Sequence, residues 1–364
     1  MNFKQLLYTF LFGTVACSFS QNSPAPEREY YFYQRLNYGS DGLIHPIRLI
    51  LNGGYGILQM DNRGNSVVKI EYANGFDNMW WNLTNPIQSI EEIGWNNFIQ
   101  TQIVPISFDS KEAYYWPNYT LHTIGGGMSF RMMDEWFYAH RFPYPKIHAL
   151  ATLMVYHLLN ETVETNDYVG YDPDPIADVL IFNPLGILLF WNNGVAGFFS
   201  HTLNMSDWSY QVSYDPFKQS IENVGQNFVM KFWLTKSERL GLFYHFGTHG
   251  ELGLSFKKSD GQCFSFGAGL VANKLEDLGD RPDLRELTAA LVLTAGVFYD
   301  RNNSLLASLI YSYTQDFKLR MNVYPGLVKI GNFSPGFYWS LNQRNQLSLG
   351  LTVRFLPIGL SASL

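Results

Sequence analysis

Three side chains in the middle of the sequence, those of His122, Glu161 and Asp178, are of types that carry out acid and base chemistry. Imidazole and carboxyl groups can exchange protons with a substrate, and together they can ligate a divalent cation. His157 and Asn160 lie within four positions of Glu161, so a helix would place them on the same face. These five residues predict either a catalytic or metal-binding site, or a buried polar network that fastens a helical segment inside the protein.

The spacing of these residues matches no established metal motif such as H-E-x-x-H, and we assign neither a metal nor a cofactor to the chain. Glu161 ends a mostly apolar run that begins near Ala149. Because desolvating an unpaired carboxylate costs several kcal/mol, Glu161 should have a partner. We expect that partner to be His122, with Asp178 joined to the pair through a shared hydrogen bond, a water or a cation.

Three consecutive glycines, Gly125, Gly126 and Gly127, stand in "LHTIGGGMSFR" directly before a predicted helix. Exposed backbone amides at the start of a helix can hold an anion such as a lipid phosphate, and Arg131 would assist. The stretch lacks the G-x-x-x-x-G-K-[ST] pattern of a phosphate-binding loop. The alternative is close backbone packing beneath the helix, with an ion pair between Arg131 and Glu135, four residues apart.

The sequence contains serine and histidine residues that could serve a nucleophilic hydrolase, but not in the sequence patterns of such enzymes. Ser200 lies in "SHT", and His245 and His249 lie in "YHFGTHG". The sequence contains no G-x-S-x-G turn and no H-x-S pair, which argues against a serine hydrolase.

The second half of the chain, from Trp208 onward, consists of short β-rich runs separated by turn signals such as "KSDGQ", "DRNN" and "NQRN". Within residues 347–353, apolar and small or polar residues alternate, which places the apolar side chains on one face of a strand. We predict one continuous antiparallel meander of strands. Its longest break is the charged stretch "NKLEDLGDRPDLRE" at residues 273–286, which predicts an exposed loop.

The preceding region has a different period. Residues 128–140 and 148–163 carry apolar residues at three- and four-residue spacing, with two prolines between them, which predicts a helical hairpin within an insert at about residues 120–200. Residues 46–60 and 66–73 are typical of a strand hairpin, which would pair with the last strand and close a barrel. Residues 101–108 are expected to be extended.

The composition indicates a chain that does not face water on all sides. Charged residues make up 15% of the sequence, against about 25% in typical soluble proteins, and aromatic residues make up 16%. The net charge of -6 and the lack of any Lys/Arg-rich run in the sequence argue against nucleic acid as a partner. The most apolar internal run, at residues 176–199, is interrupted by polar residues and by Pro184, which argues against a helical membrane anchor.

The amino terminus has the order of a secretory signal peptide, with Lys4, an apolar stretch and small residues up to Ser20. Residues 1–20 would be removed, leaving residues 21–364 as a single domain that begins at Gln21. The alternative is lipidation at Cys17. After cleavage at Ser20, Cys263 is the only cysteine of residues 21–364, so no internal disulfide framework is expected.

Export, low charge and strand runs near ten residues favour a mainly β fold, an antiparallel outer-membrane β-barrel of about 10–14 strands with an inserted helical hairpin. Only helices and closed barrels satisfy every backbone group inside lipid. The alternation alone would also fit a soluble sandwich or barrel.

Several stretches, "YYWPNYTLHTIGGGMSFRMMDEWFY", "LNETVE", "DPIADVLIFNPLGILLF", "ENVGQNFVMKF" and "FYHFG", resemble an uncharacterised family of bacterial cell-envelope proteins. The similarity covers roughly residues 90–310. It implies an outer-membrane barrel with an inserted helical segment, and it implies no reaction.

Three functions remain open. The first is a structural or transport-type outer-membrane barrel whose lumen is partly filled by the helical segment. The second is a membrane-embedded enzyme that acts on envelope lipid or glycan through His122, Glu161 and Asp178. The third is a soluble periplasmic binding protein. The expected partners are outer-membrane lipid and a small-molecule or lipid ligand, and the sequence leaves the oligomeric state open.

Overall fold

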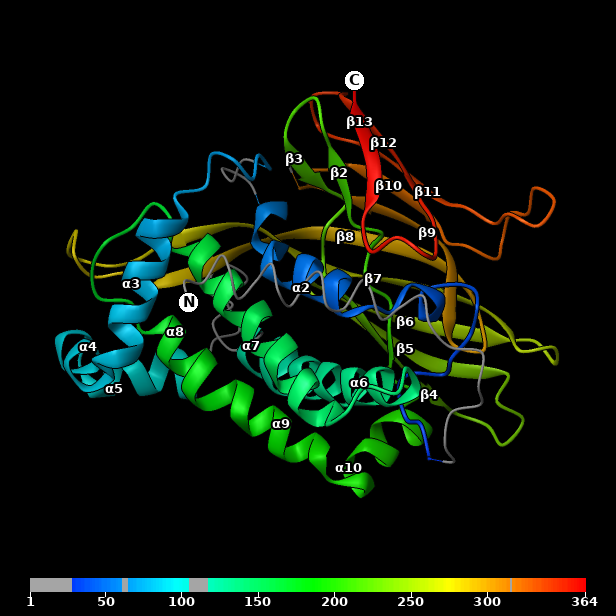
Figure 1. The fold of residues 1–364 in the computed structure, drawn as a ribbon, viewed down its shortest axis with the longest axis horizontal. Coiled ribbons are helices and arrows are strands. Elements are labelled where there is room, and N and C mark those ends of the chain that lie inside the picture. The colour runs from blue at the N-terminus through cyan, green and yellow to red at the C-terminus, as the bar shows by residue number, and fades with distance from the viewer. Residues whose placement is uncertain (1–27, 61–64, 105–116, 315) are drawn as a thin grey trace.

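A computed structural model describes residues 28–60, 65–104, 117–314 and 316–364, so the predicted signal peptide and Cys17 lie outside the described residues. The first half of the chain forms a helical layer and the second half forms a large sheet (Figure 1). The helices are η1 (Asp41–Leu43), α2 (Pro46–Gly54), η2 (Gly56–Gln59), α3 (Tyr72–Thr84), α4 (Pro86–Ile93), α5 (Trp95–Phe98), η3 (Ile99–Ile103), η4 (Pro117–Gly125), α6 (Gly126–Ala139), α7 (Pro145–Glu164), α8 (Asp174–Ala177), η5 (Asp178–Phe182), α9 (Asn183–Trp191), α10 (Asn193–Gly197) and η6 (Phe198–Thr202).

The strands belong to one sheet of 13, in the order β1-β4-β5-β6-β7-β8-β9-β10-β11-β12-β13-β2-β3. From β4 to β13 they follow one another along the chain as antiparallel neighbours, whereas β13 pairs with β2 in parallel. The strands are β1 (Ser206–Asp207), β2 (Ser213–Asp215), β3 (Ser220–Glu222), β4 (Phe228–Trp233), β5 (Leu240–Phe246), β6 (His249–Lys257), β7 (Gln262–Asp277), β8 (Leu287–Arg301), β9 (Ser304–Ser312), β10 (Leu319–Val323), β11 (Gly336–Leu341), β12 (Leu347–Thr352) and β13 (Gly359–Ser363).

The predicted mainly antiparallel sheet is therefore confirmed, and the meander is confirmed from β4 to β13. The strand pairing does not join β1 to β3 within the described residues, so the pairing alone does not close the sheet into a barrel.

The expected exposed loop at residues 273–286 is wrong for its first five residues and confirmed for the rest. β7 continues to Asp277 and β8 begins at Leu287, which leaves only residues 278–286 as a connection. The ladder continues past a register shift between Ala272 and Lys274. Leu275 packs against a buried cluster that includes Ala272 and Ala289, and this burial prevails over the charged neighbours in the sequence.

The expected amino-terminal strand hairpin is also wrong. Residues 46–60 form α2 and η2, and residues 66–71 form no strand beyond an isolated bridge between Ser66 and Ser220. Pro46 is at the first helical position, and His45 Nδ1 accepts the Ile47 amide, so the helix start is capped. Residues 101–103, the start of the stretch expected to be extended, belong to η3, and residues 105–108 lie outside the described residues.

The predicted helical hairpin is confirmed as α6 and α7, with Pro145 at the first position of α7. These two helices pack on β4 and β5 through Phe228 and Phe246. Lys231 and His245 belong to the opposite face of the same strands, because side chains alternate along a strand. The helical hairpin therefore lies outside the curved sheet and does not fill its interior, contrary to the expected lumen plug.

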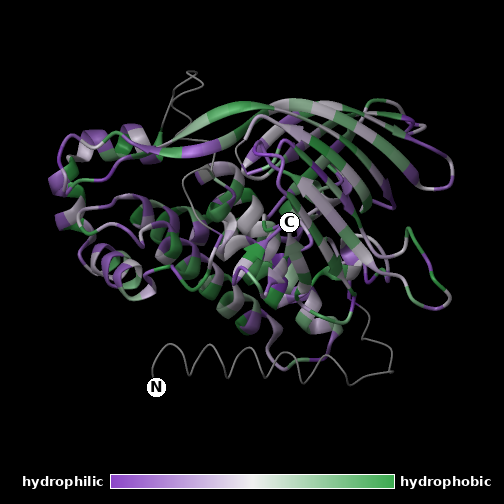
Figure 2. Ribbon diagram, turned by 90° about the horizontal axis from the view of Figure 1, so that it is seen from above, coloured by the Kyte–Doolittle hydropathy of each residue, from purple (hydrophilic) through white to green (hydrophobic). Residues whose placement is uncertain are grey.

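The inner face of the sheet is polar and aromatic. Lys231 on β4 forms an ion pair with Asp300 on β8, with 2.5 Å between Nζ and Oδ2, although three strands separate β4 from β8 in the sheet order. The Trp208 ring lies 5.5 Å from that of Phe298, centroid to centroid. Such contacts require the sheet to curl so that its two halves face one another, as the strands in Figure 2 do.

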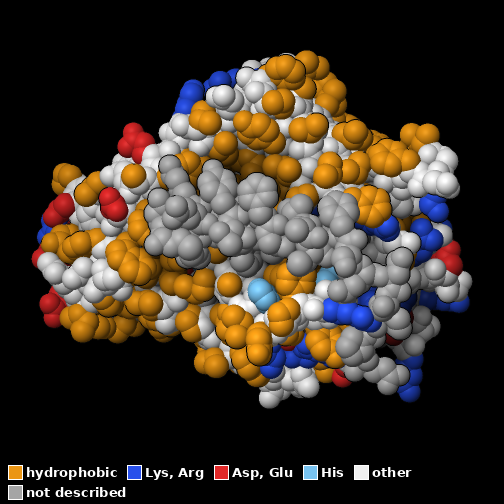
Figure 3. Space-filling view, viewed as in Figure 1, with side chains coloured by type: hydrophobic (Ala, Val, Ile, Leu, Met, Phe, Trp, Pro, Cys, Tyr) orange, Lys and Arg blue, Asp and Glu red, His pale blue; other side chains and the backbone are white. Residues whose placement is uncertain are grey.

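The outer face of the sheet is apolar wherever helices do not cover it. Leu293, for example, is 62% exposed, while the next residue on the strand, Thr294, is buried. Figure 3 shows hydrophobic side chains over the strands at the top and over the helices along the lower left. The exposed apolar residues of the strands are Phe232, Leu242, Leu252, Phe256, Phe264, Phe266, Leu270, Leu293, Val297, Leu309, Tyr311, Leu349, Leu351 and Leu360.

One continuous helical stretch, Asp174–Trp191, is long and apolar enough to cross a membrane by length and composition, and half of it is buried. A core helix of a soluble protein can pass the same test. Asp178 and Asn183, the polar residues expected to interrupt this run, turn inward to His122, whereas Leu188 is 70% exposed. The helix is therefore amphipathic, with its polar side buried and its apolar side outward.

Candidate functional site

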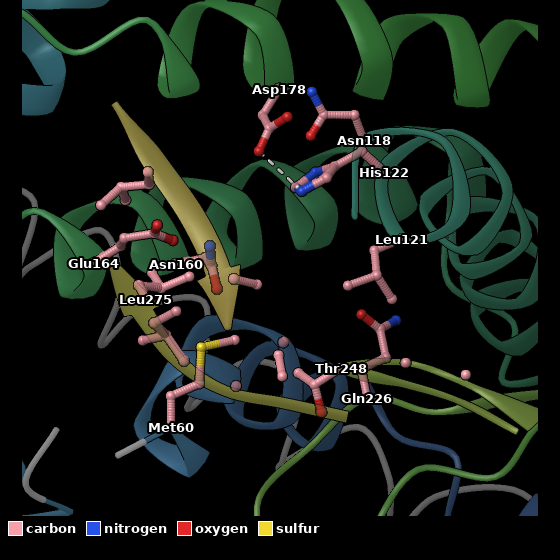
Figure 4. A pocket seen from close by; sticks show the side chains of 18 of the residues that line it. Met60, Asn118, Leu121, His122, Asn160, Glu164, Asp178, Gln226, Thr248 and Leu275 are labelled. Atoms are coloured by element: carbon pink, nitrogen blue, oxygen red, sulfur yellow. Dashed lines mark ion pairs between the residues drawn. The ribbon is translucent and has the colours of Figure 1, made fainter. Parts of the chain in front are cut away.

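A cavity of about 430 Å³ lies between the helical layer and the sheet. Its polar residues come mainly from η4, α7, α8 and η5, and its apolar residues come from η2 and from β6, β7 and β8 (Figure 4). Figure 4 shows His122 and Asp178 directed toward one another on one wall, with Met60 and Leu275 on another. The cavity thus combines one ionic pair with a largely apolar lining. The lining residues include Asn118, Leu121, His122, Asn160, Glu164, Asp178, Gln226, Thr248, Leu270, Leu275, Ala289 and Leu291.

His122 is buried and bonded at both ring nitrogens. Its Nε2 lies 2.9 Å from Asp178 Oδ2, and its Nδ1 lies 3.1 Å from Asn183 Oδ1. Burial opposes the positive charge, but the Asp178 carboxylate and these hydrogen bonds prevail and raise the pKa of His122 above its usual 6.5. A protonated ring donates to both oxygens and has no lone pair left, so this arrangement suits a structural cation better than a general base.

The π-helical turn η5 explains how two residues flank one imidazole. Asp178 begins η5, and Asn183 follows five residues later, where its amide donates to the Asp178 carbonyl. In a π-helix, residues five apart lie one above the other. The local winding therefore presents both side chains to His122.

Glu161 does not join this pair. It is 1% exposed, and neither of its carboxyl oxygens has a hydrogen-bond partner among the described residues. Burial raises its pKa well above 4.5, and the nearby carboxylates of Asp178 and Asp174 raise it further. Both effects favour the protonated, neutral form of Glu161. The expected contact between His122 and Glu161 is not formed, because Asp178 occupies the position beside the ring.

His157 and Asn160 have separate surroundings. The His157 ring stacks on that of Tyr156 at 4.0 Å between centroids and lies 5.5 Å from the His122 ring. Burial and the charge of His122 lower the pKa of His157 well below 6.5, so it is neutral. Neither of its ring nitrogens has a hydrogen-bond partner in the described part of the chain, whereas Asn160 lines the cavity. The five predicted residues therefore gather in one region, but only His122 and Asp178 are directly bonded.

The expected anion site is not formed. Gly125 ends η4 and Gly126 begins α6 without a break, so the three glycines lie within a continuous helix and not before one. A Cβ on Gly127 would lie 2.5 Å from the Gly186 carbonyl oxygen, and one on Gly125 would lie 2.5 Å from the Phe228 ring. The glycines allow close packing, which is the alternative that the sequence left open.

Arg131 is likewise engaged within the protein. Its Nε donates to Glu135 Oε1 at 3.0 Å, which confirms the predicted ion pair. The same carboxylate accepts the backbone amides of Tyr31, Phe32 and Tyr33. Arg131 and Glu135 therefore anchor the amino-terminal segment to α6.

Sequence reasoning missed Asn183 and Tyr156, which complete the surroundings of His122 and His157. A usable signal for Asn183 was its position in an apolar run five residues after Asp178. The stacking of Tyr156 on its neighbour His157 follows from tertiary burial and has no pattern in the sequence.

Comparisons of the chain with family models, curated proteins and solved structures give no match. The function proposed below rests on residues of this chain alone.

Proposed function

We propose that the protein is an outer-membrane β-barrel with a structural or ligand-binding role, and that its helical layer covers one side of the barrel wall. The observation that carries this proposal is the inverted distribution of side chains, with exposed Leu, Phe and Val outside and buried Lys, His, Glu and Asp inside. A soluble barrel or sandwich has the opposite arrangement, whereas a strand between lipid and a polar interior has this one.

Closure of the barrel is supported by the backbone around its seam. β1 pairs with β4, and β2 pairs with β3. Both pairs belong to one antiparallel alignment of residues 206–215 with residues 220–229. Between these pairs, the Trp208 amide donates to the Asn227 carbonyl at 2.9 Å and the Tyr210 amide donates to the Gly225 carbonyl at 3.0 Å. The chain then has two long strands here. One, at residues 206–215, contains β1 and β2, and the other, at residues 220–233, contains β3 and β4.

With β1 and β2 counted as one strand, and β3 and β4 as another, 13 strands become 11. In an antiparallel meander with an odd number of strands, the first and last strands point the same way. The parallel pairing of β13 with β2 is the contact that such a closure needs.

The lipid-facing surface can be tested with a fluorophore on single cysteines in a background that carries both Cys17→Ser and Cys263→Ser. The full chain carrying Leu293→Cys is labelled and reconstituted into vesicles, and quenching by bilayer-restricted brominated lipid is measured. We expect strong quenching at residue 293 and little at a Lys236→Cys control in the connection between β4 and β5. Equal, weak quenching at both positions would refute the membrane assignment. Loss of the protein from membranes on carbonate washing would instead favour the soluble periplasmic binding protein.

The cavity supports a binding role within this proposal. Its apolar lining and the His122 and Asp178 pair suit a ligand with an apolar body and a polar group, such as a lipid. Binding is measured with a fluorescent fatty acid and purified protein, and Leu121→Trp, which would fill the cavity, should abolish it. Unchanged binding in this variant would remove the cavity from the proposal.

A membrane-embedded enzyme acting on envelope lipid or glycan is the second candidate. What favours it is the buried Glu161, whose pKa burial raises, because a carboxyl of raised pKa can act as a general acid. Release of products from an envelope lipid extract by the wild type, lost in Glu161→Gln, would establish this candidate. Equal behaviour of the two proteins would leave Glu161 a structural group.

A further inference from the structure

A second cluster of chemistry-bearing side chains lies on the inner face of the sheet, and none of its three residues lines the cavity described above. His245 is on β5, and His249 and Glu251 are on β6 across the short turn. Glu251 is the register partner of His245, and His249 is two residues before Glu251, so all three share one face. Each is buried.

The three side chains converge on a small volume. His249 Nε2 lies 2.8 Å from His245 Nδ1, which in turn lies 3.2 Å from Glu251 Oε2. One ligand atom from each residue lies within 4.8 Å of the other two. Ligand atoms around a tetrahedral zinc ion are roughly 3.2 to 3.5 Å apart, given metal–nitrogen distances of about 2.0 to 2.1 Å. The observed spacing is close to that of a bound first-row metal.

Hydrogen bonds alone cannot satisfy both contacts of His245 Nδ1. His245 Nδ1 faces both a second imidazole nitrogen and a carboxylate oxygen, and all three atoms can carry a lone pair. A single proton on His245 Nδ1 can serve one of these contacts well, whereas a cation can accept a lone pair from all three atoms at once. We propose that His245, His249 and Glu251 bind one divalent first-row transition metal ion, with zinc as the reference ion.

The surrounding strands hold the carboxylate and make room for it. Thr294 Oγ1 on β8 donates to Glu251 Oε1 at 2.9 Å, which leaves Oε2 directed to the histidines. Gly267 and Gly296 are partners across the ladder between β7 and β8. A Cβ on Gly296 would lie 3.0 Å from Glu251 Oε2, and one on Gly267 would lie 3.2 Å from Glu251 Cβ. This glycine pair keeps the space beside the carboxylate free.

Two imidazoles and one carboxylate leave at least one coordination position for water or a small ligand, as in sites that are not purely structural. The site does not depend on the membrane assignment, because the three ligands belong to one hairpin of the sheet. It also does not overlap the His122 and Asp178 pair.

The test uses tag-free full-length protein, folded in detergent, stripped with a chelator and equilibrated with zinc or cobalt alone. After desalting, metal per chain is measured by mass spectrometry, and the visible spectrum of the cobalt form reports nitrogen and oxygen ligands. We expect about one metal ion per chain. Its affinity should fall at least tenfold in His249→Gln and in Glu251→Gln, and should be unchanged in the control His201→Gln, which changes an exposed histidine of η6.

Thr294→Val provides a variant that keeps all three ligands. Loss of an outer-shell hydrogen bond commonly weakens metal binding about 10- to 100-fold, so this variant should bind more weakly even if a ligand variant fails to fold. Circular dichroism checks the strand content of every protein. No metal retained by the wild type, or equal retention in the wild type, Glu251→Gln and Thr294→Val, would overturn the proposal.

Discussion

Glu161 is a carboxyl group that the fold keeps neutral. Its side chain is buried near the carboxylates of Asp178 and Asp174, so ionisation would bring like charges together in a poorly solvated region. In the unfolded chain Glu161 titrates near its ordinary 4.5. Above that pH the folded protein binds one proton more than the unfolded protein at this group. Stability contributed by Glu161 therefore falls as pH rises from about 4.5 toward its raised folded pKa.

Glu161→Gln removes this proton linkage while it keeps the shape of the side chain. We expect the variant to be at least as stable as the wild type at pH 8, and its free energy of unfolding to fall less between pH 5 and pH 8. Chemical denaturation in detergent at several pH values measures both quantities. A variant with the same pH dependence as the wild type would show that Glu161 is ionised in the folded protein.

Asp178 is the counter-charge of a buried cation. Asp178→Asn keeps a hydrogen-bonding oxygen but removes the charge that sustains protonated His122, and breaking a buried pair in this way typically costs about 3 kcal/mol or more. The exposed pair of Lys257 and Glu238 supplies the control, because Glu238→Gln should cost about 0 to 1 kcal/mol. Similar unfolding free energies for the two variants would contradict a structural role for the His122 and Asp178 pair.

At the residue scale, the sequence predicted which side chains gather but not which of them bond. His122, Glu161 and Asp178 were identified by type and position, and the structure brings them into one region. The partner of His122 depends on the π-helical winding of η5, and one added residue per turn has no signature in a single sequence. For Gly125, Gly126 and Gly127, the structure agrees with close packing, the alternative to an anion site. The sequence could not decide between the two, because the packing depends on residues of other elements.

At the element scale, apolar periodicity predicted α6 and α7 but neither α2 nor α3. α6 and α7 extend over several turns, so their period is unambiguous. α2 has only nine residues and is rich in Ile and Leu, and a run of that length fits a strand or a helix. Packing against α7 selects the helix, because Gly53 of α2 lies against the Tyr156 ring and Gly54 lies against Leu159.

The crossing of α6 and α9 gives a prediction at this scale. Gly127→Ala would place a methyl group 2.5 Å from the Gly186 carbonyl oxygen, so the two helices must move apart. Overpacking of this kind typically costs about 1 to 3 kcal/mol. Gly56→Ala is the control, since no atom lies within 4 Å of its added Cβ, and it should change stability by less than about 1 kcal/mol. Equal destabilisation of the two variants would mean that the helices are not in close contact at Gly127.

For the whole molecule, the sequence predicted the strands and the helical hairpin but not their relative placement. Alternation says that one face of a strand is apolar, and it does not say whether lipid or helices cover that face. The outer face differs along the sheet, because Phe228 is covered by α6 and α7 whereas Leu293 is exposed. The seam of the proposed barrel was also not predicted, since the amino-terminal residues expected to pair with the last strand are helical, and β2 pairs with β13 instead.

Asn52 of α2 lies directly on this seam. Its side-chain amide donates to the Tyr210 carbonyl at 3.0 Å, and its side-chain oxygen accepts the Gly225 amide at 3.0 Å, so it completes the ladder between residues 206–215 and 220–229. Asn52→Ala would leave both buried backbone groups unpaired, at about 1 to 3 kcal/mol each. We expect the folded, fast-migrating band of unheated protein in dodecyl sulfate gels to disappear at a lower temperature than in the wild type, while the exposed control Asn96→Ala behaves like the wild type. If Asn52→Ala and Asn96→Ala unfold at the same temperature, Asn52 does not hold the seam and the closure proposed for the barrel loses its main support from the helical layer.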